Sequence, residues 1–74
     1  MNSPYVVLLL QSTSQAVRGE HLLHRAGISA ILIPVPRSLA ADCGVCLRVG
    51  RADLAQALAA LREGKLEPAA THDL

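Results

Sequence analysis

The segment 31–49 constrains the fold more than any other part of the sequence, because two apolar stretches within it flank a short polar connection. Pro34 and Pro36 cannot donate ladder hydrogen bonds, so the first strand ends there or lies at a sheet edge. The connection is too short for the crossover helix that parallel strands require. We therefore expect two antiparallel strands, at about 28–35 and 45–49, joined by a loop.

The part of the chain before this segment predicts a strand and then a helix. Residues 5–10 are apolar without alternation, which is typical of a buried central strand. Ser12 and Gln15 have the capping-box spacing, in which each side chain satisfies a free backbone N–H at the helix start. We expect this helix over about 14–25, and Gly19 on its inner face indicates a close approach to the sheet.

A second helix is predicted after the last of these strands. Asp53 suits the positive N-terminal end of that helix, and Gly64 suits its end. Its apolar residues follow the i, i+3, i+4, i+7 pattern: Leu54, Ala57, Leu58 and Leu61. A short final strand could follow at 65–69, although Pro68 disfavours it, and we expect a frayed tail at 70–74.

The order strand, helix, strand, strand, helix, with a final strand as an option, predicts an α/β fold of two layers. Two helices would cover one face of a small sheet, as in a ferredoxin-like sandwich. A chain of 74 residues predicts a single domain over 1–74, ordered from about 4 to 68. Because the sequence has one aromatic residue, the core must consist of Val, Leu, Ile and Ala.

Composition argues against several classes of partner. The net charge of +1 and the single aromatic side chain disfavour a nucleic-acid surface. No apolar run approaches the ~20 residues of a membrane span. No basic region precedes the apolar run at 6–10, so we expect no signal peptide and a cytoplasmic protein. In that reducing compartment, two cysteines indicate reactive or metal-binding thiols rather than a structural disulfide.

One motif resembles a known family. Ile33-Pro34-Val35-Pro36-Arg37, then five residues, then Cys43-Gly44 and a strand ending in Leu47-Arg48, is similar to the selenium/sulfur carrier protein-like family of small bacterial and archaeal proteins. Further matches are Ser12-Thr13, Ala16, Glu20, Leu22-Leu23, Ala26-Gly27-Ile28, Asp53-Leu54 and Ala57-Leu58. The resemblance implies a carrier rather than a stand-alone enzyme, with a persulfide or selenosulfide on Cys43 and no cofactor. It also implies two protein partners, a cysteine desulfurase-like donor and an acceptor enzyme.

The residues around Cys43 fit a reactive thiol. The thiolate is the reacting species, so the pKa and the exposure of the thiol control its rate. Gly44 leaves space beside it, and Arg37 and Arg48 are the cations expected to lower its pKa, whereas Asp42 would raise it. The opposing interpretation is a small, inert, half-buried cysteine.

Two further chemistries involve both cysteines. In an extended segment, residues three apart point to opposite faces, so Cys46 would face the core while Cys43 faces outward. If the segment is instead a turn, the pair could close a disulfide, or Cys46 could resolve a persulfide on Cys43. His21 and His24 could join the two cysteines in a zinc site, but we expect both histidines to face solvent on the first helix.

An alternative function is a docking module that performs no chemistry and whose cysteine pair is structural. Small ferredoxin-like domains bind partners through a sheet face or an edge strand, and a second copy of the chain is one candidate partner. A buried Cys43 that reacts with thiol reagents no faster than Cys46 would favour this alternative.

Overall fold

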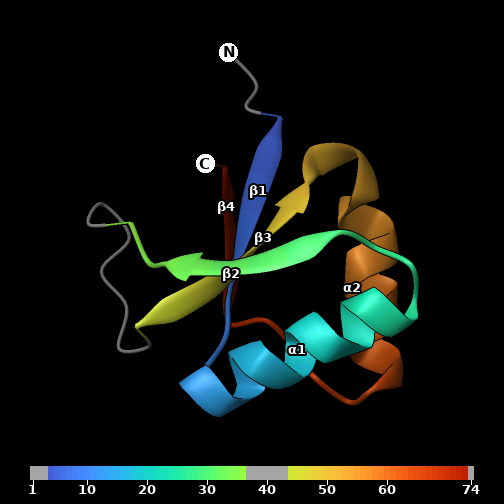
Figure 1. The fold of residues 1–74 in the computed structure, drawn as a ribbon, viewed down its shortest axis with the longest axis horizontal. Coiled ribbons are helices and arrows are strands. Elements are labelled where there is room, and N and C mark those ends of the chain that lie inside the picture. Colours follow the sequence, from blue (N-terminus) through green and yellow to red (C-terminus); the bar gives the residue numbers. More distant parts are fainter. Residues whose placement is uncertain (1–3, 37–43, 74) are drawn as a thin grey trace.

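Two helices and an antiparallel sheet of four strands make up residues 4–36 and 44–73, the part of the chain that the computed structural model describes (Figure 1). The elements in chain order are β1 (Tyr5–Leu9), α1 (Thr13–Arg25), β2 (Ala30–Pro34), β3 (Val45–Gly50), a 3-10 turn (Arg51–Asp53), α2 (Leu54–Glu63) and β4 (Ala70–Asp73). Neither helix has the length and apolar character that a membrane span requires, among the residues described.

The strands are ordered β2-β3-β1-β4 across the sheet. The predicted antiparallel pairing of β2 with β3 is confirmed: Ala30 pairs with Val49 at one end and Pro34 with Val45 at the other. As the two prolines indicated, β2 is an edge strand. β3 is therefore paired on both sides, with β2 and β1.

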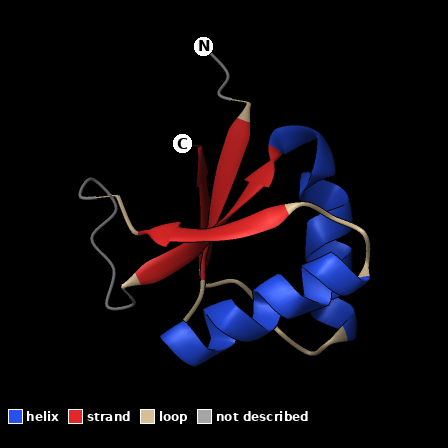
Figure 2. Ribbon diagram, viewed as in Figure 1, coloured by secondary structure: helices blue, strands red, loops and turns tan. Residues whose placement is uncertain are grey.

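The two helices lie on one side of the sheet, so the predicted two-layer arrangement is confirmed (Figure 2). Between sheet and helices, a continuous core gathers apolar residues from β1, α1, β2, β3 and α2, which include Val6, Leu8, Ala16, Leu23, Ala30, Leu47, Val49, Ala57 and Leu61. A Cβ added at Gly19 would lie 2.9 Å from Leu47 Cδ1. The predicted close approach of α1 to the sheet therefore depends on this glycine.

The ends of α1 follow the sequence signals with one difference. The Gln15 backbone N–H donates to Ser12 Oγ at 3.1 Å, which confirms the predicted cap. The Gln15 side chain, however, accepts from the Gln11 N–H at 3.3 Å, so the reciprocal bond starts one residue before the cap. Gly27, with φ of 78°, has the left-handed conformation that glycine often adopts just after a helix.

Gly64 and Lys65 together end α2. The helix ends before Gly64, as predicted, but the left-handed residue is Lys65, with φ of 61°. An added Cβ at Gly64 would meet Leu22 of α1, so this glycine permits the two helices to approach. Arg18 Nη2 donates to the Gly64 carbonyl at 2.8 Å and satisfies one of the carbonyls that a helix end leaves open.

The final strand forms, but not at 65–69 as the sequence indicated. Leu66 is instead buried in the core, where it anchors the connection from α2 to the sheet. The strand is β4, Ala70–Asp73, and it pairs antiparallel with β1. An ion pair from Arg51 to Asp73, at 2.6 Å, fixes its end. Tertiary pairing thus places a strand where we expected a frayed tail.

Candidate functional site

The connection between β2 and β3 carries the predicted thiol. Cys43 and Arg37, two residues predicted for the site, lie outside the described residues. Gly44, the residue after Cys43, is exposed, and its carbonyl accepts from the Val35 N–H at 3.3 Å. The backbone that follows the predicted thiol is therefore held at the end of the β2–β3 ladder.

No close contact with a described residue requires a glycine at position 44. A Cβ added at this position would meet no heavy atom of the described residues within 4 Å. Whether Gly44 leaves space beside the Cys43 thiol stays a prediction.

Cys46 is fully buried in β3. The sequence placed its side chain in the core, and it is buried, but on the face of the sheet opposite the two helices. There it packs in a smaller cluster with Val7 and Leu9, surrounded by Ile33, Val35 and Ala70. We call this the helix-free face, since neither α1 nor α2 packs on it. Whether Cys46 resolves a persulfide on Cys43 stays a prediction.

Arg48 lies on the same face, two residues after Cys46. Its guanidinium carbon is 4.3 Å from the centre of the Tyr5 ring, a distance typical of a cation–π contact. The register explains this contact: Tyr5 is opposite Gly50 and Val7 is opposite Arg48, so Tyr5 and Arg48 are diagonal neighbours. Arg48 follows Gly44 by four positions, which is about 13 Å along an extended strand. A role for Arg48 beside Cys43 stays a prediction.

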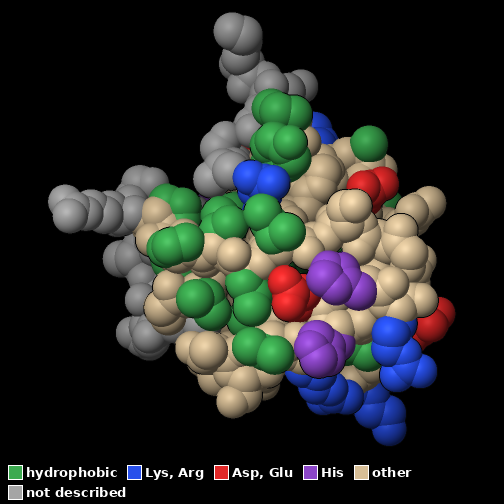
Figure 3. All heavy atoms as spheres, viewed as in Figure 1, with side chains coloured by type: hydrophobic (Ala, Val, Ile, Leu, Met, Phe, Trp, Pro, Cys, Tyr) green, Lys and Arg blue, Asp and Glu red, His purple; other side chains and the backbone are tan. Residues whose placement is uncertain are grey.

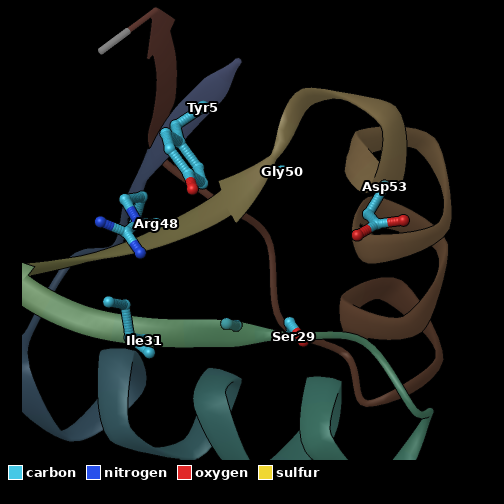
Figure 4. A pocket seen from close by; sticks show the side chains of 7 residues that line it. Tyr5, Ser29, Ile31, Arg48, Gly50 and Asp53 are labelled. Carbon is cyan, nitrogen blue, oxygen red and sulfur yellow. The ribbon is translucent and has the colours of Figure 1, made fainter.

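A hollow of about 270 Å³ lies at the end of the sheet that is remote from Gly44, beside the first residues of β2 and the last residues of β3 (Figure 4). Figure 4 shows Arg48 and Asp53 on opposite sides of this hollow. It is lined by Tyr5, Ser29, Ala30, Ile31, Arg48, Gly50 and Asp53. The sequence analysis missed this feature, and the only signal for it was the lone aromatic residue at the start of a strand.

The three described residues of the zinc alternative, His21, His24 and Cys46, lie on two sides of the sheet. His21 and His24 are exposed on α1, and Figure 3 shows histidine side chains at the surface. His24 Nε2 donates to the Ala30 carbonyl at 2.8 Å. Cys46 faces away from α1, in the helix-free cluster. Within the ranges 4–36 and 44–73, no three His, Cys, Asp or Glu side chains gather in a way that could hold a metal.

Comparison with known proteins gives one match. The model of a family described as "Putative Se/S carrier protein-like" matches residues 5–73, nearly the whole chain. No curated protein and no solved structure matches the chain. The match includes every residue that the sequence analysis assigned to the thiol site.

Proposed function

The chain belongs to this Se/S carrier-like family, and on that premise we propose that it carries sulfur or selenium as a persulfide or selenosulfide on Cys43. The observation that carries the choice of cysteine is the burial of Cys46, whose exposed fraction is 0%. A carrier thiol must meet the active sites of other proteins, and a fully buried thiol cannot do so without unfolding. Cys43, next to the exposed Gly44, is the remaining candidate.

The exchange needs no oxidant. The Cys43 thiolate attacks the outer sulfur of a persulfide on a donor protein, so that a new S–S bond forms and the donor S–S bond breaks. The donor leaves as a thiolate, and the outer sulfur remains on Cys43. In the second step a nucleophile of the acceptor takes that sulfur, and the Cys43 thiolate is released. A selenium atom in the outer position follows the same course.

This chemistry implies protein partners. Cys43 neither generates nor consumes sulfur at the persulfide level, because each step only passes the atom on. A desulfurase-like donor must supply it, and an acceptor enzyme must use it. We expect the relay in a reducing cytoplasm, where thiols stay available for exchange.

Arg37 is the expected positioning cation of the thiol. A guanidinium near a cysteine favours the thiolate and lowers the thiol pKa below its usual value of about 8.5. Replacement by Gln should therefore move the pH dependence of Cys43 alkylation to higher pH. An unchanged profile would remove Arg37 from the site.

The direct test is persulfide loading with a cysteine desulfurase and cysteine, read by mass spectrometry of the intact protein and of its peptides. Cys43→Ala should abolish the gain of one sulfur atom. Cys46→Ala is the matched control and should keep it. A wild-type protein that gains no sulfur, or a gain that is lost in Cys46→Ala and kept in Cys43→Ala, would contradict the proposal.

A docking module is the second candidate function, and the exposure of Tyr5 (40%) and Ile31 (44%) favours it. Large apolar side chains left open to solvent on one face of a sheet are typical of contact surfaces. Site-resolved alkylation distinguishes the two functions. A Cys43 that reacts no faster than the buried Cys46 favours the module, whereas a fast reaction at Cys43 below pH 8.5 favours the carrier.

A further inference from the structure

Two exposed apolar side chains and Arg48 meet at one end of the helix-free face, and Asp53 faces them from the 3-10 turn that leads into α2. Tyr5 and Ile31 are two of the three exposed large hydrophobic residues among those described. Arg48 lies between them in the register, opposite Ile31 in β2 and over the ring of Tyr5, while Asp53 lies across the hollow (Figure 4). We call these four residues the Tyr5 patch. Figure 3 shows hydrophobic side chains gathered around a basic one on the molecular surface.

The two charges of the Tyr5 patch have no ionic partner in the described part of the chain. The ion pairs found there are Arg51–Asp73 and Arg62–Glu67. The Asp53 carboxylate also makes no capping hydrogen bond to α2. The guanidinium carbon of Arg48 lies 4.3 Å from the centre of the Tyr5 ring, and a guanidinium has five N–H donors, which suit a carboxylate partner.

We propose that the Tyr5 patch is the interface of a two-fold symmetric dimer of this chain. In such an interface each surface meets its own copy, so a contact from one residue to another occurs twice. Arg48 of one protomer would pair with the partner's Asp53, and Asp53 with the partner's Arg48. Tyr5 and Ile31 of each protomer would lie on either side of Arg48 and pack beside these two ion pairs.

A second copy fits this surface because the patch is complementary to itself. Arg48, flanked by Tyr5 and Ile31, and Asp53 lie on opposite sides of the hollow (Figure 4). A two-fold rotation about the middle of the hollow brings each charge onto its opposite. A partner of one dominant charge would instead leave either Arg48 or Asp53 facing a like charge, which disfavours the wrong partner.

The expected dimer is weak. A standard interface buries about 800 Å² on each partner, which would be about a sixth of the 4635 Å² surface of this small protein. An interface of four central residues and the atoms around them buries less than this area. We therefore expect dissociation constants in the micromolar range or weaker.

The Tyr5 patch and Gly44 lie at different ends of the sheet. The patch lies where Ala30 pairs with Val49, and Gly44 lies beyond the Pro34–Val45 pair at the other end. The proposed dimer therefore leaves the Gly44 end open to a second protein. It does not depend on the proposed carrier function, so either proposal can fail alone.

Charge reversal tests the pairing. Sedimentation equilibrium from micromolar to millimolar protein should show a monomer–dimer equilibrium for the wild type. Arg48→Glu and Asp53→Arg should each weaken it at least about tenfold, since each brings like charges together. The double variant should restore affinity to within a few-fold of the wild type. Arg62→Gln, which changes an exposed arginine outside the patch, is the control and should have no effect.

Each other outcome overturns the proposal. A wild type that stays monomeric at millimolar concentration has no such dimer. A dimer that tolerates both single reversals, or a double variant that does not recover, excludes the Arg48–Asp53 pairing. Concentration-dependent amide shifts of the wild type need no variant: they should centre on Tyr5, Ile31 and Arg48, and shifts centred elsewhere would assign the interface to another surface.

Discussion

The two faces of the sheet differ in how many buried residues they hold. Among the residues that the structure describes, the face under α1 and α2 joins twelve buried residues in one core, whereas the helix-free face gathers three, Val7, Leu9 and Cys46. Neighbours on β1 illustrate the difference, because Val6 and Val7 are both buried but on opposite faces. The first face stabilises the fold, and the second combines a small apolar cluster with an exposed surface that can bind.

The largest effect should come from the centre of the helix-covered face. Leu47→Ala removes a fully buried side chain that contacts the closest approach of α1 and should lower the free energy of unfolding by about 2–5 kcal/mol. Ile31→Ala, on the exposed surface of the other face, should change it by no more than about 0.5 kcal/mol. Urea unfolding measures both values. Equal losses would show that the two faces contribute alike.

A matched pair on β1 sharpens the comparison. Val6→Ala and Val7→Ala remove the same atoms from two buried positions, so the transfer part of the loss, about 1.6 kcal/mol, is common to both. The cavity part depends on how far the surroundings can collapse. We expect a larger loss of unfolding free energy for Val6→Ala, because packed helices confine its cavity. A larger loss for Val7→Ala would mean that the helix-free cluster is the more rigid.

Gly19→Ala should lower the free energy of unfolding by about 1 kcal/mol. Alanine favours a helix over glycine by about that amount, but its methyl group would press on the buried Leu47 at 2.9 Å, and such overpacking costs about 1–3 kcal/mol. Gly44→Ala has open space around it and should change stability little. Thermal and urea unfolding of the two variants provide the measurement. A stabilised Gly19→Ala protein would show that α1 can move away from the sheet.

The smallest effect concerns the contact between Arg48 and Tyr5. Exposed cation–π contacts contribute about 0.5–1 kcal/mol. A double-mutant cycle with Tyr5→Leu and Arg48→Gln should give a coupling energy of that size in unfolding experiments at low micromolar protein. A coupling near zero would mean that the ring does not hold the guanidinium in solution.

Sequence patterns predicted the parts of the fold that local chemistry decides. The side-chain oxygen of Ser12 caps the first turn of α1, and Gly27, which has no Cβ, adopts a left-handed conformation after the helix. Both effects are local and do not depend on the tertiary context. The β2–β3 pairing followed from the shortness of their connection. The position of β4 did not follow, since it is set by pairing with β1, and the local preference of its residues is weak.

The site was predicted only in part. Alternation along β3 predicts that Cys46 and Leu47 face opposite ways, but it cannot say which face the helices cover. The contact of Arg48 with Tyr5 depends on the register of β1 against β3, and these two residues are more than forty positions apart in the sequence. Long-range register of this kind leaves no trace in local sequence patterns.

The bond from the Val35 N–H to the Gly44 carbonyl has a mechanical consequence. Gly44 continues into β3, a strand braced on both sides, whereas Pro34 ends β2, which has a neighbour on one side only. Tension applied at Gly44 is therefore passed to both neighbours of β3, whereas tension applied at Val35 is passed to the single neighbour of β2.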